Sequence, residues 1–333
     1  MADTATTLPP ARSQPRLDLR GVLTRYGAWV ALALLILFNL AFTPNFATWQ
    51  TLNVNLTQVC SIVIVGVGMT LVIATGGIDL SVGSLMAIAG ALAPLIFLGN
   101  LFPLPHPYVG IALAFVVPVL VAGAFGWFNG WLITRLRIQP IIATLVLFIA
   151  GRGIAQVMTN GNLQVFKVPE FQYIGLGRLF GLPFQAVLMV VIVLAAAWML
   201  KRTVFGRQIL AVGGNERAAR LSGIPVVSVK RRVYMISGLL SGIAGLIVIA
   251  RNSAADANLV GLGMELDAIA AVAVGGTLLT GGRATVIGTL VGALIIQLVR
   301  YTLLANGVPD AAALIAKAAI IVLAVWVQRQ GRS

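Results

Sequence analysis

Long apolar stretches without charge recur along this chain, and they constrain its fold more than any other feature. Most are long enough to cross a bilayer as a helix, which takes about 20 residues. Apolar residues make up 59% of the chain and charged residues 10%, whereas a soluble globular domain has about 25% charged residues. The sequence therefore predicts an all-α polytopic membrane protein with about ten transmembrane helices.

The predicted spans are 27–43, 56–75, 81–99, 108–132, 140–158, 184–200, 233–250, 266–280, 285–304 and 311–328. The eighth span is short and rich in glycine, so we expect it to be broken or to cross only part of the bilayer. The boundary between the second and third spans falls at Gly76-Gly77. The domains expected are a disordered cytoplasmic tail at 1–26, a membrane domain at 27–328 and a cytoplasmic C-terminus at 329–333.

The net charge of +14 follows the predicted membrane topology. The basic residues gather in the N-terminal tail, at Arg135 and Arg137, in the loop 201–232, and at Arg329 and Arg332. Ten spans that begin inside the cell place all four groups on one side, which is the positive-inside pattern of membrane proteins. Both termini are therefore expected in the cytoplasm, and the charge does not indicate binding to nucleic acid.

The loop 201–232 is the strongest indication of function. It carries eight basic residues and one acid, Glu216. Its middle predicts a very short helix in which Asn215 caps the first N–H groups and Gly223 takes the left-handed conformation at the end. The residues of this segment are Gly213, Gly214, Asn215, Glu216, Arg217, Ala218, Ala219, Arg220, Leu221, Ser222 and Gly223. A short capped helix on a charged cytoplasmic loop favours docking to a partner protein.

The chain offers no site for chemistry of its own. The phosphate-binding pattern G-x-x-x-x-G-K-[ST] does not occur, and no soluble domain of ordinary size fits between the spans. Cys60 and His106 are the only cysteine and the only histidine, and neither has partners for a metal or catalytic site. We therefore expect a chain that is no enzyme, binds no metal or cofactor, and depends on a separate chain for energy.

Asp79 is the only formally charged residue between Arg25 and Arg135. A carboxylate at the centre of a membrane helix costs about 2.5–3.5 kcal/mol, so its presence needs a reason. It either lines a polar pathway and binds a hydroxylated solute, or caps the third span by accepting N–H bonds from Ser81, Val82 or Gly83. Capping needs only local geometry and is favoured, but both interpretations stay open.

Further polar residues lie inside the spans. Arg152 is about 18 Å along the fifth span, where it either reaches outward to the membrane surface or lines a pathway, and Gln156 can share its face. The other candidates either bond across helices or face a solute. The full set of pathway candidates is Asp79, Asn55, Gln58, Asn129, Thr144, Arg152 and Gln156.

Three stretches resemble a known family. They are MTLVIATGGIDLSVGSLMAIAG at 69–90, AVGGNERAARLSGI at 211–224 and ELDAIAAVAVGGTLLTGGR at 265–283. Together they resemble the permease subunit of bacterial ATP-binding-cassette (ABC) sugar importers of the ribose, xylose and galactofuranose group. The resemblance covers about residues 50–325, and RIQPIIATLVLFIAGRGIAQ at 137–156 looks most like the galactofuranose branch.

The resemblance implies a multi-pass subunit of the bacterial inner membrane that moves a monosaccharide. It implies a second permease subunit, identical or paralogous, two ABC ATPase subunits that hold ATP and Mg²⁺, and a periplasmic sugar-binding protein. It also implies that 213–224 is the coupling helix seated in a groove of the ATPase. The alternatives are a secondary transporter working alone, which would need buried coupling-ion carboxylates, and an intramembrane enzyme.

Overall fold

Helices build most of the chain in the computed structural model, which describes residues 19–101, 106–309, 311–315, 318–319 and 322. Within these residues, six helices are long and apolar enough to cross a membrane. They are α2 (Trp49–Ala74), α4 (Pro107–Arg135), α5 (Pro140–Met158), α7 (Phe184–Arg202), α10 (Val226–Asn252) and α12 (Val286–Ala305). The all-helical membrane fold is thereby confirmed, whereas the count of ten spans and the side of the termini stay predictions.

Three further helices coincide with predicted spans: α1 (Leu19–Phe42), α3 (Val82–Phe97) and α11 (Met264–Val274). The eleven residues of α11 extend about 16 Å at 1.5 Å per residue, roughly half of the apolar thickness of a bilayer. This short helix fits the expectation of a broken or partial eighth span. Most of the predicted tenth span, 311–328, lies outside the described residues, as do residues 1–18 of the expected tail 1–26 and all of the expected C-terminus 329–333. Residues 19–26 of the expected disordered tail instead form the first turns of α1.

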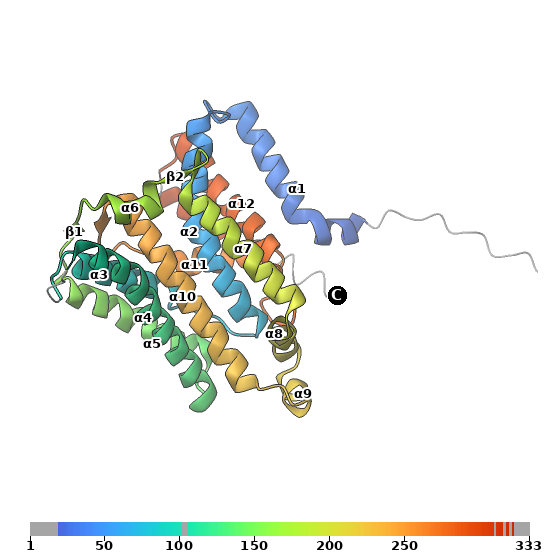
Figure 1. Ribbon diagram of the computed structural model, residues 1–333. Coiled ribbons are helices and arrows are strands. Elements are labelled where there is room, and N and C mark those ends of the chain that lie inside the picture. The colour runs from blue at the N-terminus through green and yellow to red at the C-terminus, as the bar shows by residue number, and fades with distance from the viewer. Residues whose placement is uncertain (1–18, 102–105, 310, 316–317, 320–321, 323–333) are drawn as a thin grey trace, which may run out of the picture.

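Several short elements were not predicted. On the side of the molecule opposite α9 lie α6 (Pro169–Leu176), β1 (Gln164–Val165) and the hairpin strands β2 (Arg178–Leu179) and β3 (Leu182–Pro183) (Figure 1). Strand β1 pairs antiparallel with β4 (Ala254–Ala255), and β2 pairs with β3. The start of α6 is explained by Pro169 at its first position and Glu170 in its first turn.

The core of the bundle lies along α2 and α10, whose side chains are mostly buried. Helix α10 contacts α4, α2 and α3, and α2 also contacts α12, α11 and α7. Glycines allow these helices to approach closely. A side chain at Gly126 would overlap the carbonyl oxygen of Tyr234, and one at Gly245 would lie 2.5 Å from that of Met86. Helix α1 leans away from the bundle and contacts α12 (Figure 1).

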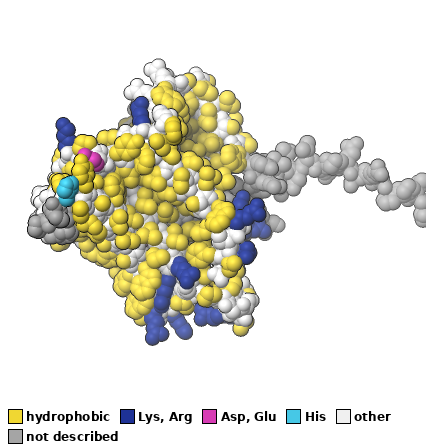
Figure 2. Space-filling view, viewed as in Figure 1, with side chains coloured by type: hydrophobic (Ala, Val, Ile, Leu, Met, Phe, Trp, Pro, Cys, Tyr) yellow, Lys and Arg dark blue, Asp and Glu magenta, His cyan; other side chains and the backbone are white. Residues whose placement is uncertain are grey.

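The surface divides into a broad apolar face and a basic end (Figure 2). Most of the Lys and Arg side chains visible in this view gather at the end where α8 (Val204–Gly214) and α9 (Glu216–Leu221) lie. The distribution agrees with a membrane-embedded body and a basic cytoplasmic end.

The basic loop is shorter than predicted. Its expected range was 201–232, but α7 continues to Arg202 and α10 already begins at Val226. Helices extend beyond their apolar runs here, because Lys201 and Arg202 in the last turn of α7 interact favourably with the negative end of the helix dipole. The residues between α7 and α10 form α8 and α9, and we call α8, α9 and the first turns of α10 the coupling hairpin.

Candidate functional site

Both ends of α9 are fixed by local hydrogen bonds. The side-chain oxygen of Asn215 accepts the N–H of Ala218 at 3.0 Å, which is the predicted N-cap. At the other end Gly223 has φ +80°, and the N–H of Ile224 reaches the carbonyl of Ala219 at 3.0 Å. This is the Schellman arrangement of a helix terminus. Both predicted caps are therefore confirmed, and they hold a helix of six residues that would be unstable alone.

The predicted extent of the short helix is wrong at its start. Gly213 and Gly214 belong to α8, and Asn215 separates that helix from α9. The extended backbone of Asn215, with φ −158° and ψ 102°, breaks the helix because its side chain can cap only from this conformation. Gly214 faces open space, whereas Gly213 is packed against other backbone segments.

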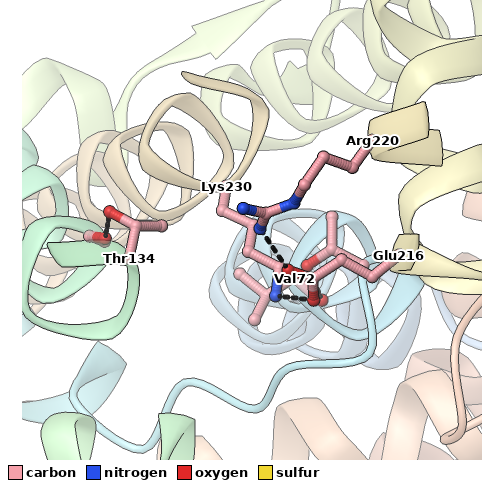
Figure 3. A network of polar contacts seen from close by, with 7 residues as sticks. Val72, Thr134, Glu216, Arg220 and Lys230 are labelled. Atoms are coloured by element: carbon pink, nitrogen blue, oxygen red, sulfur yellow. Dashed lines mark hydrogen bonds and ion pairs between the residues drawn. The ribbon is translucent and has the colours of Figure 1, made fainter. Parts of the chain in front are cut away.

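The single acid of the coupling hairpin is neutralised within it. Glu216 accepts a hydrogen bond from Lys230 of α10 at 2.7 Å and one from Arg220 at 3.2 Å, and Figure 3 shows its carboxylate between the two. The hydrogen bond from Lys230 is the main cause that lowers the pKa of Glu216 below its ordinary value, against the opposing effect of desolvation. The carboxylate therefore joins α9 to α10 and leaves the outer surface basic.

The outward face of α9 presents an apolar side chain among cations. Leu221 is 90% exposed, and Arg217 and Arg220 are exposed beside it, while Ala219 is buried beneath. Next to this face lies a groove of about 500 Å³ lined by Trp127, Arg220, Ile224, Pro225, Val226, Val227, Ser228, Arg231 and Arg232. Such a surface fits a protein partner with an apolar pocket and an acidic rim.

Asp79 lies in a buried polar cluster between α2 and α3. Its side chain has no exposed surface. One carboxylate oxygen accepts the N–H of Ser81 at 3.0 Å and its hydroxyl at 2.6 Å, and the other accepts the hydroxyl of Ser237 at 2.8 Å. The bond to the N–H of Ser81 is one of those predicted, but the N-cap residue of α3 is Ser81 and not Asp79, because the helix begins at Val82. The third bond reaches α10 and was not predicted. In this conformation the carboxylate is fully engaged in holding helices together.

Two of the other candidates belong to the same cluster. Asn129 of α4 donates to the hydroxyl of Ser81 at 2.9 Å, and its buried side-chain oxygen has no hydrogen-bond partner among the described residues. Thr144 of α5 donates to the carbonyl of Pro140 at 2.9 Å and approaches that of Ile78 at 3.4 Å. The structure thus brings Asp79, Asn129 and Thr144 together around the turn between α2 and α3.

Asn55 and Gln58 lie apart from this cluster, near the opposite end of α2. The side-chain amide of Gln297 on α12 donates to Gln58 at 2.7 Å and to Asn55 at 3.5 Å. Asn55 also donates to the carbonyl of Thr51 at 3.0 Å. These contacts are bonds between and within helices, one of the two roles that the sequence left open.

Arg152 and Gln156 share a face of α5, as predicted, and both hold the loop that follows β4. One guanidinium nitrogen of Arg152 donates to the carbonyls of Val260 at 2.6 Å and Ala257 at 2.8 Å. Gln156 donates to the side chain of Asn258 at 2.7 Å. The second terminal nitrogen of Arg152 is buried without a partner among the described residues. The side chain of Arg152 therefore binds a neighbouring loop.

Sequence reasoning considered the N–H of Ser81 but missed the hydroxyls that close the cluster around Asp79. Ser81, Ser237 and Tyr234 supply hydroxyls to the turn between α2 and α3. Small hydroxylated residues are common in spans, so their presence alone gave no signal. Within the described residues no cluster of three or more His, Cys, Asp or Glu side chains could hold a metal ion.

Comparisons with known proteins agree with this architecture. A family described as a branched-chain amino acid transport system permease component matches residues 52–325. A ribose import permease of Escherichia coli strain K12 is 43% identical over 309 residues, which are 90% of this chain and 92% of the relative. A galactofuranose transporter permease of the same strain is 40% identical and covers 90% of this chain and 88% of its own length. An L-arabinose ABC transporter permease of Azospirillum brasilense is 34% identical over 337 residues, which are 98% of this chain and 97% of the relative.

Proposed function

This chain belongs to the family of branched-chain amino acid transport system permease components, and from that premise we propose that it carries a monosaccharide across the bacterial inner membrane as the permease subunit of an ABC importer. The family description names amino acids, but the relatives with the identities given above are named for ribose, galactofuranose and arabinose. The cargo proposed is a pentose or a galactofuranose-like sugar. The ribose relative is more similar than the galactofuranose relative, so identity does not single out the galactofuranose branch.

The chain is a passive conduit in this function. Permeases of ABC importers are not enzymes, and they work with ATPase subunits and a solute-binding protein. We propose two ATPase subunits that bind ATP and Mg²⁺, a second permease subunit identical or paralogous to this one, and a periplasmic sugar-binding protein. A secondary transporter working alone is disfavoured, because one of the relatives is named as an ABC transporter permease and because Asp79 already accepts hydrogen bonds from Ser81 and Ser237.

The observation that carries the proposal is α9. Two caps and the carboxylate of Glu216 fix this short helix, and it turns a highly exposed leucine outward within a basic surface. A connecting loop does not need such rigidity, but a helix that transmits movement of the ATPase to the permease does. We therefore assign 213–223 to ATPase coupling, with α9 as the part that enters the ATPase.

Among the pathway candidates, Asn129 is the one we favour for contact with sugar. Its buried side-chain oxygen lacks a partner among the described residues and can accept a hydroxyl if α4 and α10 separate. The other candidates hold helices or loops in the described conformation. Their contact with sugar stays a proposal that applies to a more open state.

Co-purification with the ATPase tests the coupling surface. Leu221→Asp replaces the exposed apolar side chain of α9 with a carboxylate. We expect this variant to retain at least about tenfold less ATPase, because loss of a central interface contact has an effect of that size. Leu259→Asp is the matched control, because Leu259 is 65% exposed and lies in the loop that follows β4, away from α9. Equal retention of ATPase by both variants would contradict the proposal.

A further inference from the structure

The two helices that flank α9 both return to one short segment. This segment is the non-helical turn 75–81, which joins the end of α2 to the start of α3. Helix α8 packs against Ala74, the residue that immediately precedes this turn, and α10 contacts Ile78 and Asp79 within it. We call these two contacts the α8 arm and the α10 arm, and α9 lies between them in the sequence. The turn itself lacks the hydrogen bonds of a regular helix, and Gly76 in it has φ +80°. It is therefore the point where α2 and α3 can change their relative orientation most readily.

The α8 arm is a contact of backbone on backbone. A side chain at Gly213 would overlap the carbonyl oxygen of Ala74, the last residue of α2, and would lie 2.6 Å from the nitrogen of Gly282. No flexible side chain lies between the two segments to absorb a displacement, and packed protein interiors deform little. A shift of α8 toward this junction must therefore move the end of α2.

The same junction includes the turn between α11 and α12. The N–H of Gly282 donates to the carbonyl of Ala74 at 3.1 Å. Gly281, with φ +87°, also lies close to Gly76: a side chain added at Gly281 would be 2.8 Å from the backbone nitrogen of Gly76. The C-terminal end of α8 thus contacts two places where helices end, namely the end of α2 and the turn that follows α11.

The α10 arm consists of hydrogen bonds. The hydroxyl of Tyr234 donates to the carbonyl of Ile78 at 3.3 Å, and that of Ser237 donates to Asp79 at 2.8 Å. Both donors lie on α10, which follows α9 after a turn of four residues and is also joined to it by Glu216 and Lys230. A displacement of α9 therefore reaches the turn 75–81 by this second route.

We propose that the turn 75–81 is the relay through which movement of α9 reaches the translocation helices, and that Gly213 and Ser237 are its positioning residues. The proposal rests on the coupling function given above. It assigns a mechanical role to Gly213 and to the hydroxyl of Ser237. Ser237 is buried and Gly213 packs against Ala74 and Gly282, so neither residue belongs to the exposed face of α9 that would contact the ATPase. Coupling between sites requires such an element with discrete arrangements that both sites can bias.

Two helical glycines give a matched test on the assembled importer with its own ATPase and binding protein in proteoliposomes. Gly213→Ala introduces a methyl group where there is no room, whereas Gly153→Ala introduces one into open space on α5. We expect Gly213→Ala to keep the ATPase bound but to lower the amount of D-ribose, L-arabinose or galactofuranose imported per ATP hydrolysed by about tenfold, a usual size for coupling between sites. We expect Gly153→Ala to stay within about twofold of the wild type.

Two buried serines of α10 provide the second arm. Ser237→Ala removes the donor to Asp79, whereas Ser241→Ala removes a hydroxyl that donates to the carbonyl of Ser237 at 2.8 Å. Lower import per ATP in Ser237→Ala, with normal import in Ser241→Ala, would support the relay even if Gly213→Ala fails to assemble. Full coupling in both Ser237→Ala and an assembled Gly213→Ala would overturn it. That result is distinct from failure of the proposed function, in which Leu221→Asp would retain the ATPase.

Discussion

Replacement of Asp79 distinguishes its structural role from a role in the pathway. The carboxylate accepts three hydrogen bonds, two from Ser81 and one from Ser237, in a fully buried position. In Asp79→Ala the N–H of Ser81 loses its acceptor, and the α3 helix loses its tie to α10. In Asp79→Asn the amide oxygen can still accept from Ser81, and the amide nitrogen can donate to the hydroxyl of Ser237.

The magnitude follows from these contacts. Hydrogen bonds to a charged group contribute about 1.5–3 kcal/mol each, and relief of the buried charge offsets part of that loss in the alanine variant. We expect Asp79→Ala to lower the free energy of unfolding by about 3 kcal/mol and Asp79→Asn by about 1 kcal/mol. Because each 1.4 kcal/mol is a factor of ten, the ratio of folded to unfolded protein falls about 100-fold in Asp79→Ala and about fivefold in Asp79→Asn.

Equilibrium unfolding by SDS in mixed micelles measures both variants, and sugar uptake is measured on the same preparations. Ser241→Ala serves as the control, because this buried serine lies one turn beyond Ser237 and bonds within α10. If Asp79→Ala unfolds within about 0.5 kcal/mol of the control, the anchoring argument is refuted. If Asp79→Asn is stable but does not transport, the pathway interpretation gains support.

Three further outcomes follow from local geometry. Asn215→Ala should destabilise α9 by about 1 kcal/mol and speed its amide hydrogen exchange about fivefold, whereas Asn215→Asp should restore the cap; equal exchange in both variants would contradict this. Because the bond from Lys230 lowers the pKa of Glu216 below its ordinary 4.5, the tie between α9 and α10 is present above that pH and is lost as the pH falls through the lowered value. The protection of the α9 amides from exchange, measured relative to the intrinsic rate at the same pH, should therefore fall with acidity, and Lys230→Met should remove this dependence. Arg152→Met should release the loop at 257–260 and make it more accessible to proteases, since the carbonyls of Ala257 and Val260 lose their donor; unchanged cleavage would count against that role.

The helices and the caps of α9 could be predicted because their causes are local. Apolar runs of sufficient length require helices in a membrane, and an asparagine and a glycine at the ends of a short helix act on their own neighbours. The short α11 was foreseen for the same reason, because the predicted eighth span 266–280 ends in a region with glycines, at Gly275 and Gly276. The extents of α7 and α10 were not, since a helix can continue beyond its apolar run into a polar loop.

The contacts between distant residues could not be predicted in this way. Ser237 and Asp79 are 158 positions apart, and nothing in either neighbourhood indicates the other. Gly213 was placed in the segment of the short helix, but the close approach of Ala74 and Gly282 explains its lack of a side chain. Arg152 offered two predicted roles, outward reach and a pathway, but it binds the carbonyls of a loop that the sequence had not placed beside it.

Sugar uptake by proteoliposomes, with and without the ATPase subunits, tests most directly whether this chain is a conduit driven through α9. With the ATPase, the binding protein and ATP present, we predict accumulation of a monosaccharide that Leu221→Asp abolishes and Leu259→Asp preserves. The purified permease alone should accumulate nothing. Accumulation against a gradient by the permease alone, or undiminished ATP-driven uptake by Leu221→Asp, would contradict the account.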